Sequence, residues 1–387
     1  MTTSKAVTTF LLILLSSLAA QVSAQTISVL HSFANTPDGA EPVCKLVVGY
    51  NGNIFGVTYG GGKNGEGTIF RINNQVEGIT ILHNFGAGQS DGQFPVDNTG
   101  LIRDQVGNLY GTTSAGGGGT GPGTVFKLDN VTDKLTILHS FSGTDGKQPH
   151  AGLSMDALGN LYGTTNEGGN ANLGTVFEIT ASGEFSTLYS FKSRTDGYEP
   201  NGGVILDEGG NLYGATRFGG DAGYGTIYKL DTAGNHTILY NFTGGDDGQN
   251  IYGGLIRDSS GNLYGASATG GTFGYGNVFK FDTNGQLIVL YSFTDGIDRD
   301  DGAYPFTELV MDASGNLYGT TEGGGGIYGT VFEISPSGVE TSLYLFTNTH
   351  NGGLPVAGVT MDSTGNLYGT TPDGGESGYG VVFELTP

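Results

Sequence analysis

Residues 152–191 read GLSMDALGNLYGTTNEGGNANLGTVFEITASGEFSTLYSF, and this stretch predicts the fold of the whole chain. It contains four short segments rich in β-branched and aromatic residues, at 152–156, 160–165, 174–179 and 185–191. Gly, Asn and Asp separate these segments, which is typical of strands joined by tight turns. Four antiparallel strands in a unit of about 50 residues have the size of one β-propeller blade.

The central motif of this stretch recurs along the chain. Gly-Asn-Leu-Tyr-Gly begins at Gly107, Gly159, Gly210, Gly261, Gly315 and Gly365, and a variant, Gly-Asn-Ile-Phe-Gly, begins at Gly52. The copies are spaced 55, 52, 51, 51, 54 and 50 residues apart. Such regular spacing predicts seven blades of similar structure.

The two ends of the sequence indicate how the blades are arranged. The last copy stops after its third strand, at 381–385, whereas residues 26–33 have the sequence of a fourth strand with no copy before it. Seven complete blades form only if these two segments pair, which would also remove an exposed sheet edge. We therefore predict an all-β fold: a seven-bladed propeller of four-stranded blades, closed by the N-terminal strand pairing with the C-terminal blade.

The order of the motifs also resembles a known family. Gly-Asn-Leu-Tyr-Gly-Thr-Thr, then Gly-Gly, then Gly-Thr-Val-Phe, then Leu-Tyr-Ser-Phe is similar to the GloVer tandem repeat, over nearly all of the chain. Members of that family are secreted or surface-anchored, so the resemblance implies a propeller-like fold and export. Many members end in an anchoring segment that is not seen in this sequence. The resemblance implies no catalytic residues.

The N-terminal segment predicts export as well. Lys5 is followed by an apolar run at 10–15 and then by Val22-Ser-Ala24, which is the pattern of a signal peptide covering residues 1–24. One propeller domain would then cover residues 25–387. No other segment is long and apolar enough to span a membrane. We expect a secreted, extracellular monomer, or a periplasmic one if the host is Gram-negative.

Charge and composition exclude some functions. The 387 residues include 73 Gly, and 37 acidic residues against 15 basic ones give a net charge of −22. This charge makes nucleic acid an unfavourable partner, because binding to phosphates requires Lys and Arg. Three sequons, at Asn130, Asn235 and Asn241, would be glycosylated only in a eukaryotic host.

For residues that recur in every blade, the first explanation is a structural role. The turn Asp-x-x-Gly-Asn begins at Asp104, Asp156, Asp207, Asp258, Asp312 and Asp362 and is typical of a hairpin. His31, His83 and His139 occupy a strand position that is Tyr in the other blades, which indicates a packing role. His236 falls in a turn, where we expect a solvated side chain.

Two sets of loops are candidate ligand sites, and both are expected on the face opposite the Asp-x-x-Gly-Asn turns. The crossover between blades carries Asp-Gly-x-x-Pro, which either forms a turn or places carboxylates around the channel mouth, with Asp91, Asp145 and Asp196 as ligand-binding candidates. The second set carries tyrosines that either stack on sugar rings or pack between loops: Tyr224, Tyr275, Tyr328 and Tyr379.

Other residues suggest metal binding or catalysis. One long crossover contains Asp295, Asp298, Asp300 and Asp301, and this cluster is either a Ca²⁺ site or a solvated acidic loop. No cofactor is required by any motif. His150, Arg103 and Arg257 depart from the repeat and are the candidate catalytic residues.

Three functions remain open from the sequence, one of them a purely structural role in a cell surface or matrix. The first is a secreted binding propeller whose partner is an extracellular polysaccharide or a surface glycoprotein. The second is a secreted lyase, lactonase or isomerase with one site at the channel mouth. Similar blades favour binding, because catalysis requires residues that break the symmetry.

Overall fold

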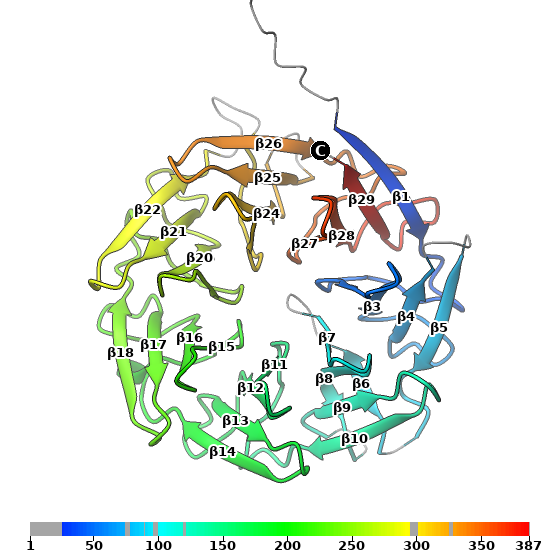
Figure 1. Ribbon diagram of the computed structural model, residues 1–387, viewed down its shortest axis with the longest axis horizontal. Helices are drawn as coiled ribbons and strands as arrows, with labels where there is room; N and C mark the ends of the chain where they lie inside the picture. Colours follow the sequence, from blue (N-terminus) through cyan, green and yellow to red (C-terminus); the bar gives the residue numbers. More distant parts are fainter. Residues whose placement is uncertain are drawn as a thin grey trace, which may run out of the picture.

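The computed structural model describes residues 25–73, 78–88, 90–95, 100–118, 121–294, 301–324 and 328–386. These residues form seven antiparallel sheets arranged as a ring around a central channel (Figure 1). The only helical element in the described ranges is the single-turn 3-10 helix η1 (Arg194–Asp196). Signal peptide residues 1–24, predicted above, lie outside the described residues. The predicted all-β propeller is confirmed.

Each blade contributes one strand to each of four concentric layers. The innermost strands are β2 (Val47–Val48), β7 (Ile102–Arg103), β11 (Ser154–Met155), β15 (Val204–Leu206), β19 (Ile256–Arg257), β23 (Val310–Met311) and β27 (Thr360–Met361). The second strands are β3 (Ile54–Thr58), β8 (Leu109–Gly116), β12 (Leu161–Thr165), β16 (Leu212–Thr216), β20 (Leu263–Ser267), β24 (Leu317–Thr321) and β28 (Leu367–Thr371).

The two outer layers are built in the same way. The third strands are β4 (Thr68–Ile72), β9 (Thr124–Leu128), β13 (Thr175–Ile179), β17 (Thr226–Leu230), β21 (Asn277–Phe281), β25 (Thr330–Ile334) and β29 (Val381–Thr386). The outermost strands are β5 (Ile79–Asn84), β10 (Leu135–Ser140), β14 (Phe185–Ser190), β18 (His236–Asn241), β22 (Leu287–Ser292), β26 (Glu340–Leu345) and β1 (Thr26–Ser32). Blade 2 has an additional short strand, β6 (Gly92–Pro95), which pairs with β8 beside β7.

The ring closes as the sequence predicted. β1 pairs with β29 from Thr26 opposite Thr386 to Ser32 opposite Val381, so the N-terminal strand completes blade 7. Figure 1 shows β1 alongside β29, on the outer side of the C-terminal blade. Closure leaves β29 paired on both sides, with β28 and β1.

Aromatic rings lock each blade to the next. The Phe after every outermost strand is buried and lies against the third-strand aromatic of the following blade, with ring centroids 5.1–5.5 Å apart in the pairs Phe33–Phe70, Phe85–Phe126, Phe141–Phe177, Phe191–Tyr228, Phe242–Phe279, Phe293–Phe332 and Phe346–Phe383. The Gly of Leu-Tyr-Gly makes room for these rings, since a Cβ at Gly163 would lie 2.5 Å from Phe177. The core therefore lies between blades, and its repeat explains the repeat of the motif.

The Asp-x-x-Gly-Asn turns lie together on one side of the ring, called here the hairpin face, and the crossovers lie on the opposite side, the crossover face. In blade 3, Asp156 Oδ1 accepts hydrogen bonds from the backbone amides of Leu158 and Asn160, while Oδ2 accepts from Asn160 Nδ2 and the Tyr162 hydroxyl. The other five Asp turns repeat this arrangement. These carboxylates have the structural role that the sequence indicated.

Because of these turns, the free energy of unfolding varies with pH in the acid range. Burial raises the pKa of the Asp156 carboxyl, but hydrogen bonds from Asn160, Leu158 and Tyr162 outweigh it and hold the pKa below its usual value. The other five turn carboxyls have lowered pKa values too. Lowered pKa values give stability that is present above the unfolded pKa of about 3.9 and is lost as pH falls through the folded values.

We therefore expect the free energy of unfolding to fall steeply below about pH 4, measured by chemical denaturation at several pH values. Asp156→Asn should make this fall slightly less steep, because one of the six turn carboxyls no longer takes up a proton on unfolding. A flat profile between pH 5 and pH 3 would contradict this explanation.

His236 is buried, and the prediction of a solvated side chain is wrong. Its side chain is 5% exposed, stacks on the Tyr189 ring at 4.5 Å, and places Nδ1 3.3 Å from Asp196 Oδ1. The residue begins β18 instead of ending the turn, so its ring points between blades 3 and 4. Burial lowers the pKa of His236 and favours the neutral ring.

Candidate functional site

The crossovers, which lead from the outermost strand of one blade to the innermost strand of the next, contain a backbone conformation that side chains rarely adopt. In each blade, the same position of the crossover has a left-handed φ between 52° and 60°; the residues at this position are Glu41, Phe94, Gln148, Glu199, Asn250, Tyr304 and Leu354. Glycine adopts this conformation without strain, whereas other residues are disfavoured there. The chain contains 73 Gly yet uses none at these positions. We infer that their side chains have a role beyond forming the turn.

Two further positions surround this one in each blade. In blades 1, 3, 4, 5 and 6 the residue after the second strand donates its backbone N–H to the carbonyl of the left-handed residue, as Arg217 N does to Glu199 O at 3.0 Å. This residue is Tyr59, Ser114, Asn166, Arg217, Ala268, Glu322 or Pro372. The residue two after the left-handed one leads into the inner strand and, in the described blades, is Val43, His150, Asn201, Tyr252, Phe306 or Val356. We call these three positions of each blade the mouth positions. Their side chains differ from blade to blade, whereas the sequences of the strands repeat.

Blades 4 to 6 join their mouth residues into one cluster. The Arg217 guanidinium lies 4.4 Å from the ring centroids of both Tyr252 and Phe218, and Arg217 Nη1 lies 3.2 Å from Glu199 Oε2. The Tyr252 ring meets Phe306 edge-on, with centroids 4.7 Å apart. Charge and aromatic contacts together hold Tyr252 in place, which makes it a preorganised ring at the mouth.

Polar atoms without partners lie beside this cluster. Asn201 is 6% exposed, and its Oδ1 atom is buried without a hydrogen-bond partner in the structure. Asn166 Oδ1 and Arg217 Nε are likewise buried without a hydrogen-bond partner in the structure. Buried polar groups nearly always have partners, so these atoms have hydrogen-bonding capacity that no group of the protein satisfies.

Two ionisable groups at the mouth have pKa values shifted toward the neutral form. Burial lowers the pKa of His150, and Glu167 opposes this shift. Burial also raises the pKa of the Glu322 carboxyl. Glu167 is held by Lys147 Nζ at 2.6 Å. His150, a candidate catalytic residue from the sequence, lies in the crossover two residues after the left-handed Gln148.

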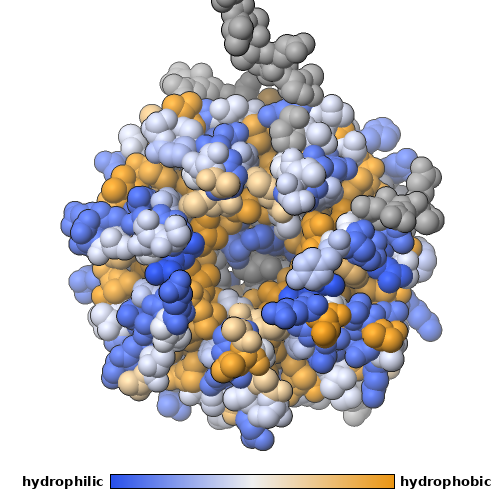
Figure 2. Space-filling view, viewed as in Figure 1, coloured by the Kyte–Doolittle hydropathy of each residue, from blue (hydrophilic) through white to orange (hydrophobic). Residues whose placement is uncertain are grey.

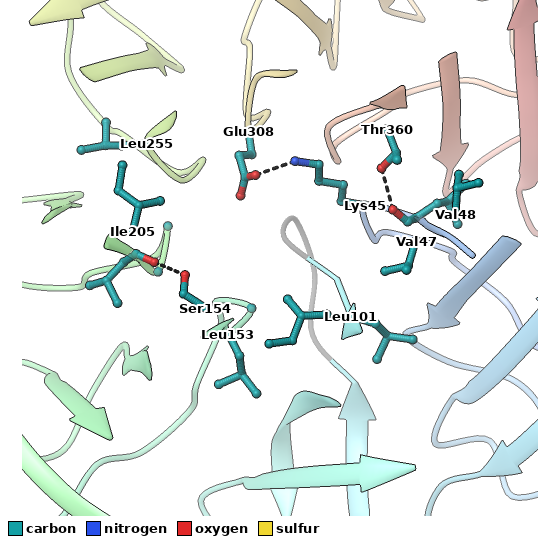
Figure 3. Close-up of a pocket in the computed structure, with 16 residues that line it drawn as sticks. Lys45, Val47, Val48, Leu101, Leu153, Ser154, Ile205, Leu255, Glu308 and Thr360 are labelled. Carbon is teal, nitrogen blue, oxygen red and sulfur yellow. Dashed lines mark hydrogen bonds and ion pairs between the residues drawn. The ribbon is translucent and has the colours of Figure 1, made fainter. Parts of the chain in front are cut away.

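A cavity of about 350 Å³ lies inside the ring, lined by residues of the inner strands. Figure 2 shows the hollow at the centre of the molecule, and Figure 3 shows Lys45 and Glu308 pointing toward one another across it. Lys45 Nζ donates a hydrogen bond to Glu308 Oε1 at 2.5 Å, and each side chain is 20% exposed.

The sequence analysis missed this pair, although a signal was present. Lys45 and Glu308 come two residues before the inner strands β2 and β23, at a position that is Gly, followed by Leu or Val, in the other five blades: Gly100, Gly152, Gly203, Gly254 and Gly358. Only two blades carry a side chain there, and the two charges are opposite. Aligning the blades at this position would have found them.

The carboxylates predicted to bind ligand are engaged by side chains of outermost strands. Asp91 lies 3.2 Å from His83 Nε2, Asp145 lies 2.9 Å from His139 Nε2, and Asp196 accepts the Tyr189 hydroxyl at 2.6 Å. Each also accepts backbone N–H groups at the start of its crossover. Their contacts are thus with the outermost strands, away from the inner strands that line the channel.

The four loop tyrosines lie on the crossover face, between blades. Tyr224 and Tyr379 are exposed, whereas Tyr275 and Tyr328 are partly buried against the cores of blade boundaries. Tyr275 approaches the left-handed residue Tyr304, with ring centroids 5.9 Å apart. These tyrosines therefore border the mouth residues.

The two arginines lie on the opposite face. Arg103 and Arg257 end inner strands at the hairpin turns, and Arg103 sits over the exposed Tyr50 ring at 4.5 Å. They are not brought together with His150, which is on the crossover face.

The acidic cluster is only partly described. Asp295, Asp298 and Asp300 lie outside the described residues, whereas Asp301 is fully buried and occupies the repeated crossover position. Its carboxylate accepts hydrogen bonds from the Tyr291 hydroxyl and from N and Oγ1 of Thr294. In the described ranges no group of three or more His, Cys, Asp or Glu side chains is arranged to hold a metal ion.

The side-chain amides of the three sequons are engaged in hydrogen bonds. Asn130 Nδ2 donates to Val106 O, Asn235 Nδ2 to Asp231 and Asn241 Nδ2 to Asp221. Among the described residues, no helix is both long and apolar enough to cross a membrane.

Solved structures share the propeller fold at low sequence identity. Virginiamycin B lyase from Staphylococcus aureus has a TM-score of 0.63 and 12% identity, over 94% of this chain and 99% of that one. The extracellular domain of a protein described as a one-component system from B. thetaiotaomicron has a TM-score of 0.56 and 10% identity, over 91% of this chain and 40% of that one. At these identities the likeness shows the fold alone.

Sequence comparison gives the family. Among curated proteins, none matches the sequence. The family model of the Gloeobacter/Verrucomicrobia repeat matches residues 18–209 and 200–387, which together cover nearly the whole chain. The chain therefore belongs to the Gloeobacter/Verrucomicrobia repeat family, as the order of its motifs predicted.

Proposed function

We propose that this protein is a secreted, monomeric binding propeller that recognises a glycan at the channel mouth of its crossover face. The observation that carries the proposal is the ring of seven non-glycine residues with left-handed backbone. A repeated strain that glycine would relieve is maintained only where the side chains are needed. Their chemistry differs from blade to blade, as a site for an asymmetric ligand requires.

The chemistry of blades 4 to 6 favours a sugar ligand. Tyr252 and Phe306 offer aromatic surface, and the unpaired Oδ1 atoms of Asn166 and Asn201 need hydrogen-bond donors. Sugars supply both an apolar face for stacking and several hydroxyl donors. Cleft sites commonly combine apolar walls with a few polar groups of this kind.

A glycan array probed with residues 25–387 tests the proposal. We expect Tyr252→Ala to weaken binding of a retained glycan about tenfold or more, because it removes the ring that Arg217 and Phe306 hold in place. Tyr50→Ala on the hairpin face is the matched control and should bind like the wild type. If the wild-type protein binds none of the glycans on the array, glycan binding is refuted.

The same array with and without EDTA tests the Ca²⁺ hypothesis for the loop containing Asp295, Asp298 and Asp300. A Ca²⁺ site would make binding or the melting temperature sensitive to the chelator. Insensitivity of both quantities would dismiss it.

A second candidate function is that of a lyase or lactonase. The observation that favours it is the Lys45–Glu308 pair, an acid and a base that break the symmetry inside the channel. The structurally similar virginiamycin B lyase supports considering this class, although the likeness concerns the fold. Mass spectrometry of the array ligands after incubation with the protein would distinguish turnover from binding.

A further inference from the structure

Among the described residues that line the channel cavity, two side chains are charged, those of Lys45 and Glu308. Lys45 and Glu308 come just before β2 and β23, whose strands run from the crossover face toward the hairpin face, so the pair lies at the crossover-side end of the cavity. The other lining residues that the structure describes are uncharged. A ligand that enters the cavity from the crossover face would meet this pair first.

From this arrangement we propose that the channel receives the end of a glycan chain, with Lys45 and Glu308 binding neighbouring hydroxyl groups of the terminal sugar. The inference rests on the proposed function and specifies how the glycan binds. The cavity binds the terminal sugar of the chain, and the mouth residues contact the sugars that follow it. Four features of the described residues support it.

The first feature is the placement of the two side chains. A Cβ at Gly100 would lie 2.0 Å from Lys45 O, and one at Gly358 would lie 2.2 Å from Glu308 O. A Cβ at Gly254 would lie 2.7 Å from Gly202 O. The backbone of neighbouring blades thus excludes side chains from these blades, while blades 1 and 6 carry long side chains of opposite charge that meet.

The second feature is the remaining hydrogen-bonding capacity of the pair. An ammonium group has three N–H donors, and Glu308 Oε1 occupies one of them at 2.5 Å. The carboxylate keeps further acceptor sites on both oxygens. Of two adjacent hydroxyls, one can accept from Lys45 while the other donates to Glu308, so both charges keep a partner.

The third feature is that the pair is electrically neutral as a unit. An anionic ligand would be repelled by Glu308, and a cationic ligand by Lys45, at contact distance. A neutral ligand with several hydroxyls satisfies both groups. This selects an uncharged sugar over a uronate or an amine.

The fourth feature is the wall beyond the pair. Val47, Val48, Ile102 and Ile205 make this part of the lining apolar. The Ser154 and Thr360 hydroxyls already donate to Val204 O and Leu46 O. The walls therefore offer few free polar partners to a second sugar below the first, and a cavity of about 350 Å³ is at the small end of ligand sites. A chain end fits this environment better than a chain passing through.

Two size fractions of the same neutral polysaccharide, an array hit, test the proposal by competition. If the protein binds ends, inhibition curves of fractions tenfold apart in length coincide when concentration is counted in chain ends. If it binds along the chain, they coincide when concentration is counted in sugar residues. The second result would overturn this inference and leave the proposed function standing, whereas an array without hits would overturn both.

Variants of the pair give a second test. Lys45→Met and Glu308→Gln should each weaken binding of the shorter fraction at least tenfold, whereas Lys229→Met should not. Lys229 is a matched control because it lies over the Tyr213 ring, outside the channel lining. Melting temperatures report whether each variant is folded. Unchanged affinity in folded Lys45→Met and Glu308→Gln proteins would overturn the inference.

Discussion

Removing residues 1–33 should abolish the folded propeller, whereas removing residues 1–24 should leave it intact. β1 supplies the fourth strand of blade 7, and Phe33 after it is fully buried against Phe70 of blade 1. Loss of a buried Phe side chain alone costs about 3–5 kcal/mol. This compares with a total stability of roughly 5–15 kcal/mol for a whole domain. Circular dichroism and the melting temperature would measure the loss.

The truncation acts on closure as well as on the core. Without β1, the outer edge of β29 becomes an unpaired strand edge next to an opened boundary between blades 7 and 1. Such edges favour aggregation. A synthetic peptide of residues 25–33 should restore the melting transition if pairing is what is lost, because it contains β1 and Phe33, while Asp38, whose carboxylate lies 2.9 Å from His31 Nε2, remains in the truncated protein. A truncated protein that melts like the full domain would show that closure does not depend on β1.

The sequence predicted the architecture because the repeat encodes it directly. Each strand, turn and aromatic contact recurs seven times, so the spacing of Gly-Asn-Leu-Tyr-Gly fixes blade number, and the strand sequences at the two ends indicate closure. The hairpin role of Asp156 and its equivalents followed from local chemistry alone. Local patterns of this kind are visible in one dimension.

Most of the candidate site could not be predicted in this way. The outermost strands contain a register shift just before the His or Tyr position, as between Ile137 and His139 in β10. Such bulges re-aim side chains, and here His139 meets Asp145. The sequence therefore suggested Asp145 as a ligand-binding residue without revealing its partner on the outer strand.

The left-handed residues and the channel pair were hidden for other reasons. Nothing in the sequence marks Glu199 or Tyr304 as having a positive φ, because the turn is imposed by contacts with the neighbouring blade. Lys45 and Glu308 are 263 positions apart in the chain and meet only because the ring closes. The arginines were more conspicuous, yet they point to the hairpin face.

Asp301 provides the second large effect that we expect on stability. The Asp301→Ala variant should lose about 3 kcal/mol or more of its free energy of unfolding, measured by chemical denaturation. The carboxylate is fully buried and accepts hydrogen bonds from the Tyr291 hydroxyl at 2.7 Å and from N and Oγ1 of Thr294 at 2.9 Å each. Alanine would leave buried donors without these acceptors, and each unmet donor costs about 1–3 kcal/mol.

The chain itself supplies the control for this prediction. In blade 7 the equivalent position is Asn351, whose side chain still contacts the Tyr344 hydroxyl and accepts from Thr347 Oγ1 at 3.1 Å. The position therefore needs a hydrogen-bonding side chain of this shape more than it needs a negative charge. We accordingly expect Asp301→Asn to retain most of the stability that Asp301→Ala loses. Equal losses in the two variants would indicate that the charge itself matters, which would reopen the case for a cation near this crossover.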